Sequence, residues 1–158
     1  MSTNILFLDI DWVLATEFST RLEDLWTTFS DTCVKNLDRI CNEVPWLQIV
    51  ISSTWRKGRT IQELREMFKI RGFSNYVKVI DKTPNLARKY ETVFRWEEIH
   101  SWIKENYPYQ YINYVIVDDD SDMLEYQMKR FVKTDTFIWL SDEKTNEIIN
   151  LFKNYVSK

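Results

Sequence analysis

Two acidic sequences each follow a run of apolar residues, and their carboxylates are the strongest candidates for chemistry. Asp9 and Asp11 come directly after NILFL, and Asp118 follows YVIV and opens the sequence DDDSD. Two carboxylates about 5 Å apart repel by about 3 kcal/mol at an effective dielectric constant near 20. A hard cation that needs few protein ligands, such as Mg²⁺, removes that cost. We therefore expect these acids to surround Mg²⁺; the alternative is that each is a solvated turn residue or a helix cap.

A hydroxyl-rich sequence and one arginine complete a set of groups that suits phosphoryl transfer. Ser52 and Ser53 follow the apolar run LQIVI, where a hydroxyl and backbone N–H groups can hold an anion. Arg95 lies 23 residues before Asp118, and its guanidinium could contact a phosphoryl oxygen or a carboxylate nucleophile. Carboxylates, a hydroxyl, a cation and Mg²⁺ are the parts that phosphoryl transfer through an aspartyl phosphate requires.

Strand and helix patterns alternate along the chain, which predicts the elements that must position these residues. Apolar runs predict strands at residues 4–8, 47–51, 76–80, 114–117 and within 131–140. Residues at helical spacing between them predict helices, so we expect an α/β fold. The expected architecture is a Rossmann-like three-layer sandwich with a mostly parallel sheet of about five strands, in the order 3-2-1-4-5. Because this order reverses between the first and fourth strands, both acidic sequences should meet at the ligand-binding edge.

The composition excludes several other kinds of protein and site. The length of 158 residues predicts a single domain over 1–158, and the net charge of −3 argues against a basic nucleic-acid-binding module. Gly58 and Gly72 are the only glycines, so no glycine-rich phosphate loop is present. One histidine and two cysteines argue against a structural zinc site. No leader-like start or long apolar run is found, so we expect a cytoplasmic protein without a membrane segment.

Two segments do not fit the alternation of strands and helices. Residues 15–30 carry apolar residues at helical spacing, and residues 81–95 are polar and contain several cations. Loops longer than about 12 residues are often functional in compact domains. The first segment could be a mini-cap or flap over the site, or simply a packed surface helix. The second could be a binding loop or a solvated loop.

These sequences resemble the four motifs of the haloacid dehalogenase-like (HAD) phosphatase superfamily. The first motif, DxDx[T/V], is matched by residues 9–13, and the second, a hydrophobic strand ending in serine or threonine, by LQIVIS ending at Ser52. Arg95 matches the third motif, with Lys82 as the other candidate, and VDDDSD matches the fourth. ISSTWR, RWEEI and VDDDSDM are also similar to the small HAD domains associated with RNA-repair proteins.

The resemblance implies a catalytic role for four residues. Asp9 would attack phosphorus and bind Mg²⁺ through its other oxygen. Asp11 would protonate the leaving oxygen and then activate the water that hydrolyses the aspartyl phosphate. Ser52 would bind a phosphoryl oxygen, and Arg95 would orient the nucleophile and the phosphate.

The resemblance also implies the metal ligands. Asp118 would bind Mg²⁺ directly, while Asp119 or Asp122 would hold its waters. The expected metal set is therefore Asp9, Asp11, Asp118, Asp119 and Asp122.

The short space for a cap implies an open site that admits large phosphorylated substrates. A Mg²⁺-dependent phosphomonoester hydrolase of this kind could act on a nucleic-acid end with a 3′-phosphate, or on a nucleotide. The expected substrate-binding residues, which would hold the phosphoryl group, backbone phosphates or a base, are Ser52, Ser53, Arg56, Arg88 and Trp12. Trp12 stands where many members of the superfamily have glycine. The alternatives are solvated charges with core tryptophans, and a non-catalytic HAD-like module that binds a phosphorylated ligand.

Overall fold

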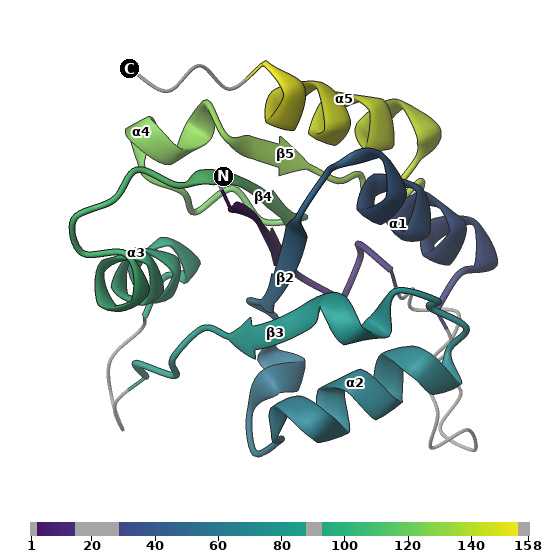
Figure 1. Cartoon of the computed structure of the whole chain (residues 1–158), viewed down its shortest axis with the longest axis horizontal. Coiled ribbons are helices and arrows are strands. Elements are labelled where there is room, and N and C mark those ends of the chain that lie inside the picture. The colour runs from purple at the N-terminus through teal and green to yellow at the C-terminus, as the bar shows by residue number, and fades with distance from the viewer. Residues whose placement is uncertain (1–2, 15–28, 88–92, 155–158) are drawn as a thin grey trace.

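The centre of the fold is a parallel sheet of five strands, seen in a computed structural model that describes residues 3–14, 29–87 and 93–154 (Figure 1). The strands lie in the order β3-β2-β1-β4-β5, and every neighbouring pair is parallel. They are β1 (Asn4–Leu8), β2 (Leu47–Ile51), β3 (Val79–Lys82), β4 (Asn113–Asp118) and β5 (Phe131–Lys133). The predicted fold class and strand order are therefore confirmed.

Helices cover both faces of the sheet and produce the predicted three layers. The described helices are α1 (Asp31–Glu43), α2 (Ile61–Ile70), α3 (Arg95–Asn106), α4 (Glu125–Met128) and α5 (Asp142–Lys153), with short 3-10 turns η2 (Thr54–Arg56) and η3 (Tyr76–Lys78). Core residues of α1, α2 and α5 pack on one face, and core residues of α3 pack on the other. In Figure 1, α3 lies to the left of the sheet, α1 lies to its right and α2 lies below β3.

One strand begins later than the sequence predicts, and another occupies only the start of its predicted range. Residues 76–78 form η3, so β3 begins only at Val79. β5 ends at Lys133, and the residues after it form a loop with an antiparallel bridge between Asp135 and Trp139. Apolar composition marks residues that suit a sheet, but pairing also requires a neighbouring strand within reach.

The register of the central strands places the catalytic candidates in one row. The last residues of β1 and β2 pair with each other, and the last residue of β1 also pairs with Val117 of β4. The next residues, Asp9, Ser52 and Asp118, therefore lie side by side at the carboxyl edge of the sheet. Side chains alternate between the faces of a strand. Because Phe7 packs on the α3 side, this row also faces α3.

The starts of two helices show how local sequence fixes the surroundings of the site. Thr60 and Glu63 form a capping box at the start of α2, which lies just beyond η2. The start of α3 is capped from a distant part of the chain, because Asp122 Oδ2 accepts a hydrogen bond from the Arg95 backbone N–H at 2.8 Å. This contact ties the loop after β4 to the first residue of α3.

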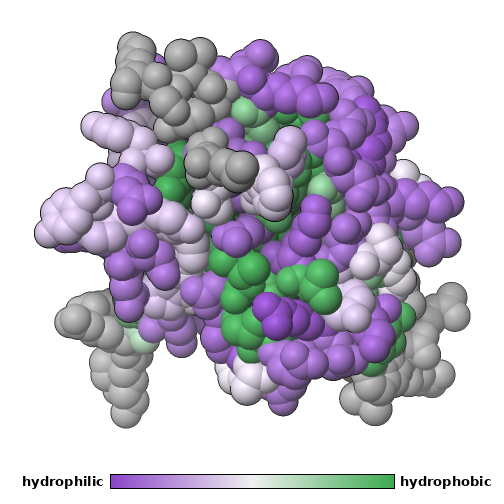
Figure 2. All heavy atoms as spheres, in the orientation of Figure 1, coloured by the Kyte–Doolittle hydropathy of each residue, from purple (hydrophilic) through white to green (hydrophobic). Residues whose placement is uncertain are grey.

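The outer surface is mainly polar on the side shown in Figure 2, with a small apolar area over β3. A hollow of about 510 Å³ lies at the amino ends of the strands, bordered by Trp46, Val77 and Ile80 among others. Among the helices that the structure describes, none has the length and apolar character needed to cross a membrane.

Candidate active site

Three carboxylates meet where β1 and β4 end. One oxygen each from Asp9, Asp118 and Asp119 lies within 4.8 Å of the other two. Asp9 is 4% exposed and Asp118 is 0% exposed. Ligand oxygens about 2.1 Å from an octahedral Mg²⁺ are about 3 to 4 Å apart. The spacing and the all-oxygen donor set therefore fit Mg²⁺.

Burial and mutual repulsion perturb these carboxyl groups when no cation is bound. Burial, reinforced by the charge of Asp9, raises the pKa of Asp118 to about 8, although Arg95 opposes the shift. Burial also raises the pKa of Asp9 and of Asp119. Asp118 Oδ1 accepts a hydrogen bond from the backbone N–H of Asp120 at 3.0 Å, whereas Asp118 Oδ2 has no hydrogen-bond partner in the described part of the chain. A buried carboxylate oxygen that accepts no hydrogen bond suits a metal ligand better than a structural side chain.

Arg95 is the cation that reaches the carboxylates. Its Nε lies 3.2 Å from Asp118 Oδ2, and its Nη2 lies 3.8 Å from Asp9 Oδ1. Both contacts are ion pairs without hydrogen-bond geometry. Burial alone would lower the pKa of Arg95, but the nearby Asp9 and Asp118 outweigh this effect and raise it. Lys82, the other candidate for the third motif, instead donates to the backbone carbonyls of Arg56 and Arg59.

Two acids of the expected metal set lie outside the three-carboxylate cluster. Asp122 caps α3 through Oδ2, while its buried Oδ1 lacks a partner among the described residues. Asp11 is half-buried, and its Oδ1 accepts a hydrogen bond from the indole Nε1–H of Trp55 at 2.9 Å. The structure therefore brings three of the five expected ligands into one cluster, and metal binding by the set stays a prediction.

The two serines after β2 are both fully buried, but they have different surroundings. The Ser53 side chain hydrogen bonds to Asp9 and lowers its pKa against the effect of burial. Ser52 is fixed by its backbone, whose N–H donates to the carbonyl of Leu8 at 2.9 Å. Its Oγ has no hydrogen-bond partner within the described ranges. A hydroxyl in this position can donate to an anion that enters the site.

The expectation that Arg56 contacts the backbone phosphates of a substrate is not met, because its guanidinium is buried within the protein. Arg56 is only 2% exposed, and its guanidinium has five N–H donors. Nε donates to the carbonyl of Thr83 at 2.9 Å, and Nη1 donates to the carbonyls of Ser52 and Ser53 at 3.2 and 2.8 Å. Nη2 donates to the carbonyl of Pro84 at 3.1 Å and to the carboxylate of Glu98. All five donors are thus used to join the loops after β2 and β3 to α3.

Trp12 adopts a backbone conformation that explains the glycine found there in many members of the superfamily. Its φ angle is 58°, in the left-handed region that glycine occupies with little strain. Thr134 Oγ1 donates to the Trp12 carbonyl at 3.2 Å, which links this turn to the loop after β5. Base stacking by the indole stays a prediction. Arg88 and most of the expected mini-cap at 15–30 lie outside the described residues.

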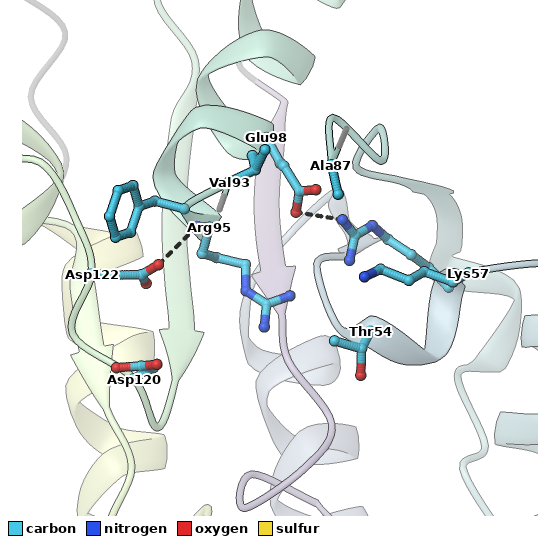
Figure 3. A pocket seen from close by; sticks show the side chains of 10 residues that line it. Thr54, Lys57, Ala87, Val93, Arg95, Glu98, Asp120 and Asp122 are labelled. Carbon is cyan, nitrogen blue, oxygen red and sulfur yellow. Dashed lines mark hydrogen bonds and ion pairs between the residues drawn. The ribbon is translucent and has the colours of Figure 1, made fainter. Parts of the chain in front are cut away.

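A cavity of about 470 Å³ opens around the Arg95 side chain (Figure 3). Arg95 extends into it from α3, between Asp120 and Asp122 on one side and Thr54 and Lys57 on the other. Its wall also includes Ala87, Val93, Phe94, Glu98 and Arg56. The cavity is large enough for the organic part of a phosphate ester and adjoins the group that would hold the phosphate.

Sequence reasoning missed the residues that support the site. It assigned neither Trp55 nor Glu98 a supporting role, yet Trp55 donates a hydrogen bond to Asp11 and Glu98 accepts one from Arg56. The available signal was position: Trp55 lies within a few residues of the end of β2, and Glu98 lies one helical turn after Arg95. Position alone does not reveal which side chains meet.

Comparison with known proteins agrees with the motif assignment. A family model described as the HAD domain in Swiss Army Knife RNA repair proteins matches residues 5–145, from β1 into α5. No curated protein and no solved structure gives a significant match. The matched range contains all four motifs in their expected order, on the strands and helix that bring them together. The chain therefore belongs to the family of HAD domains in Swiss Army Knife RNA repair proteins.

Proposed function

We propose that the chain is a Mg²⁺-dependent phosphomonoester hydrolase that acts through an aspartyl phosphate on Asp9. The observation that carries the proposal is a group of buried polar atoms beside Asp9 that lack hydrogen-bond partners within the described residues, namely Ser52 Oγ and Asp118 Oδ2. Buried polar atoms are normally paired. A phosphoryl group would pair with the hydroxyl, and a cation would pair with the carboxylate.

Asp9 is held in a position suited to nucleophilic attack. Ser53 and the backbone of Ile10 hydrogen bond to it, and Arg95 is its nearest ion-pair partner. These contacts favour the ionised nucleophile against burial, which raises its pKa. Mg²⁺ held by Asp9, Asp118 and Asp119 would neutralise charge on the phosphoryl group and reduce its repulsion of the nucleophile.

Ser52 and Arg95 would bind the phosphoryl group, and Asp11 would transfer the protons. Ser52 Oγ and the Arg95 guanidinium would donate hydrogen bonds to phosphoryl oxygens, where negative charge gathers in the transition state. Asp11 would give a proton to the leaving oxygen as the ester bond breaks. It would then accept a proton from the water that attacks the aspartyl phosphate, which restores Asp9 and releases phosphate.

The cavity beside Arg95 would bind the leaving group. Phe94 is 48% exposed on its wall and offers an aromatic face, while Lys57 offers a positive charge to a second phosphate. These features favour a nucleotide or a nucleic-acid end with a 3′-phosphate over a small aliphatic phosphate. A non-catalytic module that binds a phosphorylated ligand is the second candidate, because the same groups would also hold a phosphate without turnover.

A phosphatase panel with Mg²⁺ distinguishes the two candidates. The panel contains p-nitrophenyl phosphate, mononucleotides, and oligonucleotides phosphorylated at either end. We expect phosphate release that stops with EDTA and that is fastest on a nucleotide or a 3′-phosphorylated oligonucleotide. Stoichiometric binding of these ligands without release would overturn the hydrolase and support the binding module.

A further inference from the structure

We propose that Trp55 is a positioning residue that holds Asp11 by its indole N–H, leaving one carboxylate oxygen of Asp11 for proton transfer. This inference rests on the proposed function. The structural basis is the hydrogen bond from Trp55 Nε1 to Asp11 Oδ1, at 2.9 Å. It joins the turn after β2 to the turn after β1, across 44 residues of sequence.

The indole is fixed by packing on its other sides. Its ring lies 6.0 Å from the ring of Phe29, and the Arg71 guanidinium carbon lies 5.5 Å from the ring centroid. Phe29 in turn packs edge-on against Phe68 of α2, at 5.2 Å. Trp55 thereby belongs to the edge of the main core, and its N–H points in one direction. A donor fixed in this way can restrict the carboxylate that accepts its hydrogen bond.

The geometry matters because Asp11 has to perform two proton transfers from one position. With Oδ1 bound to the indole, Oδ2 is the atom that can face the leaving oxygen and later the water. Proton transfer depends steeply on such placement, and a shift of about 1 Å can cost as much as 10²-fold in rate. Trp55 would thus act through Asp11 without touching the substrate.

Trp55→Phe tests this role, because it keeps a packed ring but removes the N–H. We expect kcat/KM for an alkyl phosphate to fall about tenfold, which is within the range for the loss of one hydrogen bond. For p-nitrophenyl phosphate the fall should be less than about threefold, since a nitrophenolate leaves without a proton. Inhibition by inorganic phosphate should be unchanged, because Ser52, Arg95 and Mg²⁺ are untouched.

Trp102→Phe is a matched control. Trp102 also donates its indole N–H to an aspartate, Asp81 Oδ2, at 2.6 Å, and it packs in the opposite core cluster away from Asp11. We expect this variant to lose stability without changing the ratio of kcat/KM for alkyl and aryl phosphates. An equal change of that ratio in both variants would show a general effect of lost packing and would overturn the proposal.

A double-mutant cycle separates positioning from a structural effect. If Trp55 acts through Asp11, Trp55→Phe should have no further effect on kcat/KM in an Asp11→Asn background. Independent, multiplying losses would indicate separate roles and would contradict the proposal.

An NMR measurement tests the contact without relying on activity. The assigned Trp55 indole N–H resonance of the ¹⁵N-labelled protein should shift in Asp11→Asn, whereas the Trp102 indole resonance should stay in place. A Trp55 resonance that does not respond would overturn the positioning role, even in an active phosphatase. A clear response in a protein that hydrolyses no phosphate would keep the Trp55–Asp11 contact and reject the proposed function instead.

Discussion

The two edges of the sheet treat buried polar groups in opposite ways. At the amino edge, the Asn113 amide donates to Asn4 Oδ1 at 2.7 Å and to the Phe152 carbonyl at 3.0 Å, and it accepts from Arg130. Asn4 Nδ2 in turn donates to the carbonyl of Pro45 at 2.7 Å. Both N–H donors and the oxygen of the Asn113 amide are therefore paired within the protein.

At the carboxyl edge, by contrast, several buried polar atoms make no hydrogen bond within the described residues. Asp118 Oδ2, Asp122 Oδ1 and Ser52 Oγ have no hydrogen-bond partners in the part of the chain that the structure describes. A buried polar atom without a partner costs about 1 to 3 kcal/mol. The amino edge therefore pairs its polar groups within the protein, whereas under the proposed function the carboxyl edge gives up stability to keep atoms available for a ligand. Substitutions at the two edges should therefore separate activity from stability.

The largest expected effect is the loss of activity in Asp9→Asn. An amide is a much poorer nucleophile and metal ligand than a carboxylate, so we expect phosphate release to fall by about 10³-fold or more. The melting temperature in EDTA should not fall, because one buried negative charge is removed from the three-carboxylate cluster. Steady-state kinetics with Mg²⁺ and a melting curve measure the two effects. Near-normal turnover would rule out the aspartyl phosphate.

The second effect is a loss of stability of the metal-free protein as the pH rises. The pKa of Asp118 is raised to about 8 by burial and by Asp9, so the folded protein holds this proton more tightly than the unfolded chain. The free energy of unfolding should therefore be highest near pH 4. It should decline by on the order of a few kcal/mol as the pH rises to about 8. Urea unfolding in EDTA across this range measures it. Asp118→Asn should flatten the decline, and an equally steep decline in that variant would contradict the assignment.

At the amino edge we expect Asn113→Ala to lower the free energy of unfolding by about 2 to 3 kcal/mol, because it removes the hydrogen bonds of Asn113 with Asn4, Arg130 and the Phe152 carbonyl. Urea unfolding measures the loss. Below the unfolding transition, kcat should stay within about twofold of wild type, since no group at the carboxyl edge changes. A large fall in kcat with little loss of stability would remove the proposed contrast between the edges.

The smallest effect is stabilisation by the cation itself. Mg²⁺ at 10 to 30 times its Kd should stabilise the folded protein by about 1 to 2 kcal/mol, or several degrees in Tm. Asp118→Asn should melt no lower than wild type in EDTA and gain much less from Mg²⁺. Paired melting curves at matched ionic strength measure both values. The same gain in the two proteins would show that Asp118 does not hold the metal.

The sequence predicts the backbone of this site better than its side-chain contacts. Apolar runs and their alternation with helices predict the strands and the α/β class, and the commonest strand order of such folds is the one found. The register then brings Asp9 beside Asp118. The burial of Arg56, the capping of α3 by Asp122 and the Trp55–Asp11 hydrogen bond are not predictable in this way. Each joins residues far apart in sequence, and no local periodicity reports which of two distant side chains will meet.

The five hydrogen bonds of Arg56 restrict where substrate preference can change by mutation. One guanidinium supports three separate segments of the cavity wall, so lysine, with a single charged nitrogen, cannot replace it without releasing part of the wall. The exposed side chains of Lys57, Ala87 and Phe94 line the same cavity without forming that junction. Under the proposed function, a changed preference for the leaving group should therefore arise by substitution at these three positions. The part of the cavity wall that Arg56 joins would stay unchanged.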